Sequence, residues 1–189
     1  AQLFIDSDLE WQGWTLSDSV SINYSTGRRE LSFNAVDGLA LLKDIPLPIP
    51  TSQNINTINK LLYYITTSLN LIDFPSNPNL KTVCSYYALG MDNRDDDPAA
   101  EPFNQTYLPY RTFIKDDEYI SCFDVLNNII KSFACRLFQA GGKWWIVSIN
   151  EFANINAYYT EYDDAMTVVD SGTIDTLSTI EGYTGNTSQ

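Results

Sequence analysis

The sequence predicts an α+β fold in which two amphipathic helices pack on a sheet made mainly of antiparallel β-hairpins. Three stretches support this class. Residues 121–149 have the pattern of a helix that leads directly into a tight hairpin. Residues 20–35 alternate apolar and polar side chains on both sides of a short turn, as in a hairpin with one apolar face. Residues 51–70 place apolar side chains at helical spacing, which predicts a second helix.

The chain has the composition of a globular protein with a strong acidic bias. Its 189 residues are 44% hydrophobic, which is enough for a substantial core. The formal net charge is −13, and no basic residue follows Lys143. Binding to a phosphate backbone requires cations, so we expect no sequence-specific nucleic-acid binding. No apolar run is long enough to cross a membrane, so we expect no membrane insertion.

In the first third of the chain, the predicted hairpin is followed by two helices. The hairpin turns at residues 25–28, and its apolar positions are Val20, Ile22, Tyr24, Leu31, Phe33 and Ala35. Residues 39–45 predict a short helix that ends at the prolines beginning with Pro46. Thr51 or Ser52 can cap the next helix, whose apolar stripe extends over about four turns. That stripe consists of Ile55, Ile58, Leu62, Ile65 and Leu69.

The helix predicted after Ser121 has clear start and stop signals. Ser121 and Asp124 form a loose capping box at its first turn. Its apolar stripe consists of Val125, Leu126, Ile129, Ile130 and Phe133. Beyond it, Gly141 and Gly142 supply the positive φ angles that a two-residue hairpin turn needs.

The Gly-Gly register divides the hairpin side chains between two faces. Phe138, Trp145, Val147 and Ile149 share the face that we expect to meet the helical stripe. Trp145 is therefore predicted to pack against Ile129 or Ile130. The opposite face is also apolar, so it requires a partner chain or a second layer. The interface candidates on that face are Trp144, Leu137 and Ile146, and Trp144 is expected to be partly exposed in an isolated chain.

The chain divides by composition into two parts. Residues 1–157 form the expected α+β module, interrupted at 92–106 by an acidic, proline-containing segment that we expect to be an exposed loop or a mobile insertion. Residues 158–189 form a β-hairpin followed by a Thr-, Ser- and Gly-rich tail. The chain begins abruptly with an apolar run at Ala1, so we expect it to be part of a longer polypeptide.

No catalytic, cofactor or metal site is predicted, and we expect the protein not to be an enzyme. The absence of histidine removes the usual general base of a serine or cysteine hydrolase. Residues 92–103 lack the glycine and glutamate of an EF-hand loop. Cys84, Cys122 and Cys135 have neither metal-ligand nor disulfide-framework spacing, and are expected to be buried free thiols.

Three segments together resemble a family of viral structural proteins. LSFNAVDGLALLKDI at 31–45, TINKLLYYITTSLNL at 57–71 and CFDVLNNIIKSFACRLFQAGGKWWIVSI at 122–149 occur in the order seen in tail hub proteins of tailed bacteriophages. The same group includes baseplate-hub and tail-associated proteins and the hub of the type VI secretion spike. The resemblance spans roughly residues 20–150 and is one of pattern and order, without an invariant signature.

This resemblance implies a barrel-like sheet and a structural role. The expected assembly is a homo-oligomer, with a trimeric ring favoured, that joins tail-tube to tail-tip proteins. The expected location is the virion tail, after synthesis in the cytoplasm of the bacterial host. No catalytic residue is implied.

The acidic bias suits a ring that surrounds a channel for DNA. Carboxylates on the wall would repel phosphates over roughly 10 Å at 0.1 M salt. The alternative is ordinary solubility charge scattered over the outside. The channel-lining candidates, which the first interpretation places together on one concave surface, are Asp116, Asp117, Glu118, Glu161, Asp163 and Asp164.

Two other function classes remain open. A carbohydrate-binding module that recognises a cell surface could use Trp11, Trp14, Trp144, Trp145 and the 12 tyrosines as a stacking platform. In that case several aromatic rings would line one exposed groove, whereas a structural hub would bury them. A glycoside hydrolase would need two carboxylates on either side of a cleft, and 24 acidic residues leave that pair unspecified.

Overall fold

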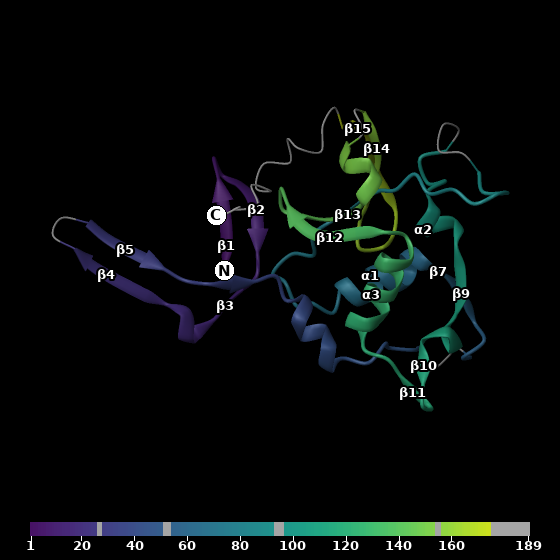
Figure 1. Cartoon of the computed structure of the whole chain (residues 1–189), viewed down its shortest axis with the longest axis horizontal. Coiled ribbons are helices and arrows are strands. Elements are labelled where there is room, and N and C mark those ends of the chain that lie inside the picture. Colours follow the sequence, from purple (N-terminus) through teal and green to yellow (C-terminus); the bar gives the residue numbers. More distant parts are fainter. Residues whose placement is uncertain (26–27, 51–53, 93–96, 154–155, 175–189) are drawn as a thin grey trace.

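The computed structural model describes residues 1–25, 28–50, 54–92, 97–153 and 156–174. Figure 1 shows a body of sheet and helices from which one long hairpin extends. The α+β class predicted from the sequence is confirmed. None of the described helices is long and apolar enough to cross a membrane.

The body is built on an open five-stranded sheet. In spatial order its strands are β12 (Cys135–Ala140), β13 (Lys143–Ser148), β8 (Leu80–Val83), β14 (Ala157–Tyr162) and β15 (Val168–Ile174). β13 and β8 are parallel, and every other neighbouring pair is antiparallel. The expected barrel-like closure is wrong for the described strands, because β12 and β15 are two separate edges of this sheet.

Two helices cover one face of this sheet, as predicted. They are α1 (Leu61–Leu69) and α3 (Cys122–Ser132). The side chains of Ile65, Val125 and Ile129 are buried in one cluster with Trp144 and Ile146 of β13. The predicted cap of α3 is also present, since the Ser121 hydroxyl accepts a hydrogen bond from the amide of Asp124.

The hairpin register is confirmed, but the assignment of its faces is wrong. Phe138 pairs with Trp145 and Ala140 with Lys143, as the two glycines require. Trp144 and Ile146, however, face the helices, whereas Trp145 and Val147 pack on the opposite face with Val83 and Ala157. Successive side chains of a strand point to opposite faces of the sheet. The connection between α3 and β12 therefore decides which alternate side chains of the hairpin face the helices.

Both tryptophans of this hairpin are buried in a single chain. Trp144 is 1% exposed and Trp145 is 8% exposed. The expectation that Trp144 is partly exposed is therefore wrong, and Trp145 does not pack on the helical stripe. The physical reason is that α1 and α3 cover the face with Trp144, whereas Trp145 is enclosed on the other face by side chains of β8, β12 and β14 and by Phe152.

The helix expected from Thr51 begins ten residues later. Residues 51–53 lie outside the described residues, and Ile58–Lys60 forms β7, which pairs with β9 (Tyr107–Pro109). The amide of Leu61 donates to the Thr106 carbonyl, so pairing with a distant segment replaces the first helical turns. Ile55 and Ile58 are consequently exposed.

The acidic segment is only partly an exposed loop. Residues 93–96 lie outside the described residues, but α2 (Pro102–Gln105) follows, capped by the side chain of Glu101. Phe103 is fully buried with its ring 4.8 Å from that of Phe133. The expectation of an exposed loop is wrong for this end of the segment, because Phe103 provides an apolar anchor in the core.

The boundary expected after residue 157 cuts through the central sheet. β14 and β15 form the expected hairpin, but β14 also pairs with β8, from Tyr162↔Leu80 to Thr160↔Thr82. Residues 158–174 therefore continue the sheet of the preceding module. The Thr-, Ser- and Gly-rich tail at 175–189 lies outside the described residues.

Smaller elements complete the chain. A 3-10 helix at Leu39–Asp44 occupies the place of the predicted short helix. The remaining strands are β1 (Gln2–Ile5), β2 (Asp8–Gln12), β3 (Trp14–Thr15), β4 (Ser21–Ser25), β5 (Arg28–Ser32), β6 (Ala35–Val36), β10 (Ile114–Lys115) and β11 (Glu118–Tyr119). The other 3-10 helices are Ser17–Ser19, Tyr110–Phe113 and Ile149–Ala153. Cys84, Cys122 and Cys135 are buried, and none of them forms a disulfide within the described residues.

Candidate assembly surface

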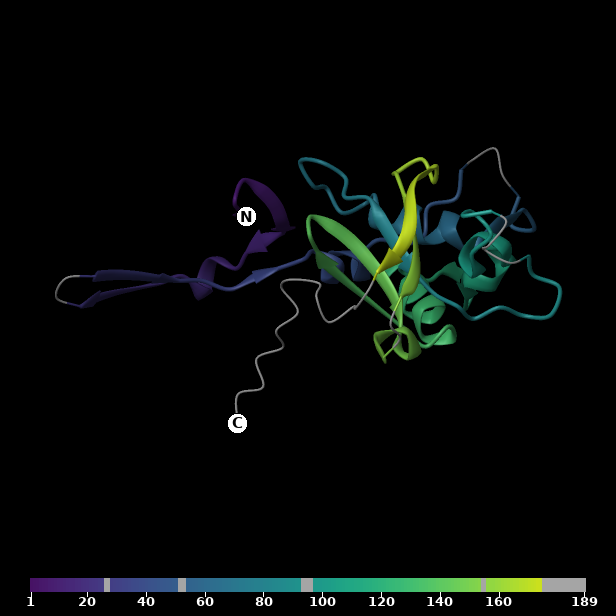
Figure 2. The same cartoon turned by 90° about the horizontal axis from the view of Figure 1, so that it is seen from above.

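The hairpin of β4 and β5 extends away from the body. Its strands pair antiparallel from Ser21↔Ser32 to Ser25↔Arg28. Two views at right angles both show it as a narrow ribbon with no other element beside it (Figures 1 and 2). We call residues 19–36, which contain this hairpin, the arm.

The arm has one apolar face, and that face is uncovered. Ile22 lies directly opposite Leu31, and the same register places Val20 opposite Phe33. Val20 is 51% exposed, Ile22 50%, Leu31 60% and Phe33 48%. The intervening positions Ser21, Asn23 and Ser32 are polar. The arm is thus an amphipathic ribbon whose apolar face has no second layer.

The base of the arm is firmly joined to the core. β3 pairs with β6 at Trp14↔Val36. The ring of Trp14 stacks on Phe74 at 5.0 Å, and Phe74 lies 6.1 Å from Trp144 of the central sheet. Gly38 has a φ of 84°, and a Cβ there would lie 2.4 Å from Trp14. A row of aromatic rings therefore connects the projecting arm to the core.

Exposed apolar side chains gather in the N-terminal part of the chain. Among the described residues, 18 large hydrophobic side chains are exposed, and 10 of them lie within residues 1–41. They are Leu3, Phe4, Ile5, Leu16, Val20, Ile22, Leu31, Phe33, Val36 and Leu41. Extended exposed apolar surface of this kind is typical of a contact with another protein.

A second apolar feature lies on the body beside α3. It is a groove of about 130 Å³, which we call the α3 groove, lined by Leu39, Phe123, Leu126, Asn127, Ile130 and Leu137. Of the three interface candidates, Leu137 is half-buried and lines this groove, whereas Trp144 and Ile146 are buried beneath the helices.

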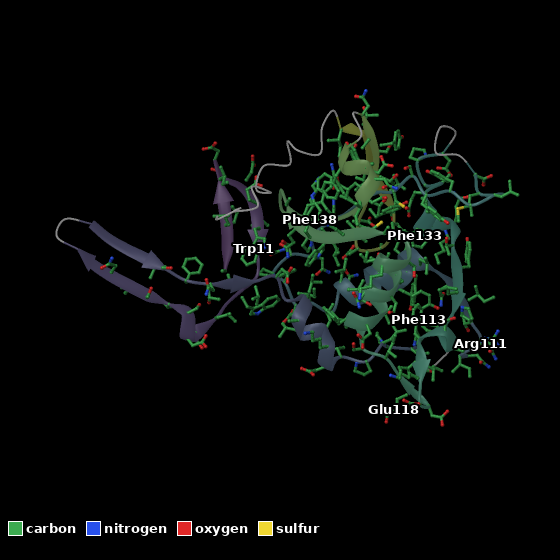
Figure 3. All side chains as sticks on the ribbon, in the orientation of Figure 1. Trp11, Arg111, Phe113, Glu118, Phe133 and Phe138 are labelled. Atoms are coloured by element: carbon green, nitrogen blue, oxygen red, sulfur yellow. The ribbon has the colours of Figure 1, made fainter. Side chains whose placement is uncertain are left out.

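Four of the six channel-lining candidates occupy two hairpin turns, and a fifth, Glu118, begins the strand that follows one of them. Asp116 and Asp117 have positive φ angles in the β10–β11 turn and, with Glu118, are exposed. Glu118 lies at the far end of the body from β14 and β15 (Figures 1 and 3). Asp163 and Asp164 belong to the β14–β15 turn, where Asp163 accepts a hydrogen bond from the amide of Thr167. Whether a ring brings the two turns to one channel stays a prediction.

The sixth candidate, Glu161, is buried and paired. Its carboxylate lies 2.7 Å from the Lys143 ammonium and 3.2 Å from that of Lys81. The Asn79 amide donates a third hydrogen bond at 2.6 Å. Burial raises the pKa of Glu161, but the hydrogen bonds from Lys143, Asn79 and Lys81 outweigh burial and hold the pKa below its ordinary value. Within this chain, the buried carboxylate of Glu161 neutralises two lysines, so it offers little exposed charge to a channel wall.

The ion cluster extends across β8 and β14 to β15. The Lys81 ammonium lies 3.9 Å from the centre of the Tyr159 ring, a cation–π contact. The Tyr159 hydroxyl donates to Asp170, and this hydrogen bond lowers the pKa of the Asp170 carboxyl. Burial, followed by the bond to Asp170, raises the pKa of Tyr159 to about 12. These contacts join three neighbouring strands, which is a structural role.

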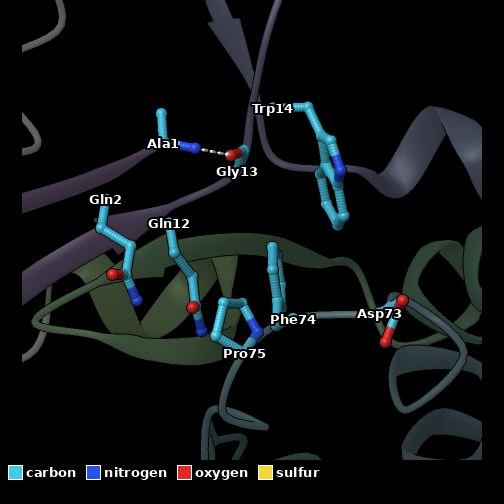
Figure 4. A pocket seen from close by; sticks show the side chains of 8 residues that line it. All are labelled: Ala1, Gln2, Gln12, Gly13, Trp14, Asp73, Phe74 and Pro75. Atoms are coloured by element: carbon cyan, nitrogen blue, oxygen red, sulfur yellow. Dashed lines mark hydrogen bonds between the residues drawn. The ribbon is translucent and has the colours of Figure 1, made fainter.

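No group of three His, Cys, Asp or Glu side chains suitable for a metal occurs in the described part of the chain. A hollow of about 330 Å³ between β2 and residues 73–75 is lined by Gln12, Trp14, Phe74 and their neighbours (Figure 4). Asp73 is the one carboxylate among its described lining residues, so this hollow has no carboxylate pair for glycoside hydrolysis.

The tryptophans do not form an exposed stacking platform. Trp144 and Trp145 are buried, and Trp11 and Trp14 are half-buried. An exposed groove lined by several aromatic rings is what a carbohydrate-binding module would need, so the burial favours the structural interpretation.

Sequence reasoning found the hairpin of the arm and its apolar face, but not its projection. No local signal distinguishes an apolar strand that is covered by the chain from one that is left uncovered. The Glu161 cluster was also missed, because its lysines come from two other strands.

The fold and these surfaces define an α+β protein with an open mixed sheet and an uncovered apolar arm. Comparisons of the chain with protein-family models, with curated proteins and with solved structures found no significant match.

Proposed function

We propose that this protein is a structural component of a phage tail, a hub or tail-tip ring that joins the tail tube to the distal tip. The observation that carries the proposal is the uncovered apolar face of the arm at Val20, Ile22, Leu31 and Phe33. Such a face is suited to permanent contact with another subunit, because water is an unfavourable neighbour for it.

Two further observations support this function. The segment resemblance gives the arm and the helices that follow it the same order as in tail hubs. The net charge of −13 suits a wall along which DNA must slide without binding. In the proposed ring, the exposed carboxylates of Asp116, Asp117, Glu118 and Asp164, together with the half-buried carboxylate of Asp163, face the channel.

The other two classes receive less support. Burial of Trp144 and Trp145 removes half of the tryptophans from any sugar-binding platform. Glu161 is held by two lysines, so it is poorly suited to act as a general acid or a nucleophile.

Electron microscopy of the purified protein, together with antibody labelling of phage particles from the host, tests this proposal. We expect closed rings in the first experiment and label at the tail end distal to the capsid in the second. Absence of the protein from purified particles would overturn the tail assignment. A ring in which the five carboxylates point outward would overturn the channel lining alone.

A further inference from the structure

The arm has a structural requirement that its own chain does not meet. A two-stranded hairpin is at best marginally stable in water and normally needs a third strand or a packed layer. Here the ribbon points away from the body (Figures 1 and 2), so the described body cannot supply that layer. Ile22 and Leu31, which form one cross-strand pair, are both at least half exposed.

The charge distribution indicates which partner the arm fits. By sequence, the arm contains Arg28, Arg29 and Glu30 as its charged residues, a net charge of +1. The rest of the chain has 9 basic and 23 acidic residues, a net charge of −14. The arm therefore has a small charge opposite in sign to that of the remainder, which favours contact of the arm itself with the body of another copy, although two whole copies of net charge −13 repel each other.

The body also presents an apolar acceptor. The α3 groove is lined almost entirely by apolar side chains, Leu137 and Ile130 among them, and its volume of about 130 Å³ admits a side chain such as Leu or Phe. The arm of the same chain extends away from its own body (Figure 2). The groove is therefore available to the arm of another copy.

We infer that the apolar face of the arm binds the α3 groove of a second copy of this chain. The inference rests on the proposed function in that it names the contact which builds the oligomer. Because the two surfaces differ, each contact joins an arm to a groove. Reciprocal exchange of two arms closes a dimer, and repetition in one direction closes a larger ring or extends a filament.

A mixing experiment tests this directional contact. The arm variant carries Ile22→Ser and Leu31→Ser, and the groove variant carries Leu137→Asp. Sedimentation velocity should show self-association of the parent, with each variant alone at least tenfold weaker. An equimolar mixture should form a 1:1 dimer and nothing larger, because one intact arm and one intact groove remain. No association in the mixture, or association of either variant equal to that of the parent, would overturn the inference.

The matched control changes apolar residues of similar exposure on the body. Ile149 is 51% exposed and Val169 50%. Ile149→Ser with Val169→Ser should leave the association constant unchanged. An equal loss in this control would show that general surface apolarity drives association, and would overturn the role of the arm. Near-ultraviolet circular dichroism from the buried Trp144 and Trp145 checks that each variant is folded.

The charge contribution is tested separately. Arg28→Glu with Arg29→Glu changes the net charge of the arm from +1 to −3. We expect at least tenfold weaker association at low salt, and a smaller difference at 1 M salt, where the Debye length is about 3 Å. An unchanged association constant at low salt would overturn the role of charge in choosing a second copy.

Failure of this inference can be distinguished from failure of the proposed function. If rings form and label the tail but the arm variant assembles normally, the arm contact is wrong and the tail assignment stands. If the mixing experiment succeeds but phage particles lack the protein, the contact stands and the tail assignment is wrong.

Discussion

The Lys143 ammonium on β13 lies 2.7 Å from the Glu161 carboxylate on β14, across the intervening strand β8. Lys81, on β8 itself, approaches the same carboxylate at 3.2 Å. One buried acid thus joins three strands, of which β8 is distant in sequence from the other two. Loss of its charge would leave two lysine ammonium groups close together, with only the more distant Asp170 carboxylate, 4.0 Å from Lys81, to compensate them among the described residues.

Glu161→Gln should therefore lower the free energy of unfolding. We expect a loss of about 1–3 kcal/mol, less than for a deeply buried pair because Lys143 remains partly accessible to water. Urea-induced unfolding, monitored by fluorescence, measures this loss in unfolding free energy. The control Asp164→Asn, at an exposed turn position, should change the value by less than about 0.5 kcal/mol.

The same carboxylate gives stability a defined pH dependence. The pKa of Glu161 is lowered in the folded protein by the hydrogen bonds from Lys143, Asn79 and Lys81, which outweigh burial. Its contribution is therefore present above the ordinary carboxyl pKa, and is lost as pH falls through the lowered value. The difference in unfolding free energy between the parent and Glu161→Gln should shrink as pH falls from about 7 to about 3. A difference that is constant over this range would contradict the assignment.

The two tryptophans of β13 should both be essential for stability. Trp144→Ala and Trp145→Ala should each cost about 3–5 kcal/mol, because each removes a large buried ring. Chemical denaturation measures both. Trp144→Phe should cost clearly less than Trp144→Ala, since it retains an aromatic ring in contact with Phe74. A Trp144→Ala protein as stable as its parent would show that β13 presents the other face to the helices.

Comparison with Gly90 separates two effects of replacing Gly38 by alanine, namely backbone strain and contact of the new Cβ with its neighbours. Both have positive φ, 84° and 93°, so alanine at either site incurs backbone strain of about 1 kcal/mol. Only at Gly38 would the new Cβ meet Trp14 and Ile72, at 2.4 and 2.8 Å. Gly38→Ala should therefore be the more destabilising variant, and should increase hydrogen exchange at β3 and β6. Equal melting temperatures for the two variants would show that the base of the arm accommodates the new Cβ at little energetic cost.

Local signals predicted local structure well. The Ser121 and Asp124 cap, and the register set by Gly141 and Gly142, are both confirmed because their causes lie within a few residues of their effects. The faces of Trp144 and Trp145 could not be predicted in the same way. They depend on β8 and β14, which no pattern within residues 121–149 reveals.

The start of α1 shows the same limit. Ile55 and Ile58 continue the helical spacing of Leu62 and Ile65, yet Ile58 belongs to a strand that pairs with Pro109. Pairing with a remote segment outweighs a periodicity that fits the helix. Of the candidate site, the apolar pattern of the arm was predictable, whereas the groove beside Leu137 arises only when α3 and β12 pack together.

The position of β8 between two hairpins has a consequence for how the chain folds. β12–β13 and β14–β15 join neighbouring segments and can form quickly, since only a short loop must close. Each then exposes an unpaired edge until β8, which is made earlier in the chain, inserts between them through Trp144↔Leu80 and Thr160↔Thr82. Until that insertion, open edges can pair with those of other nascent chains. We therefore expect the insertion of β8 to limit the rate of folding and to set the period in which aggregation competes with it.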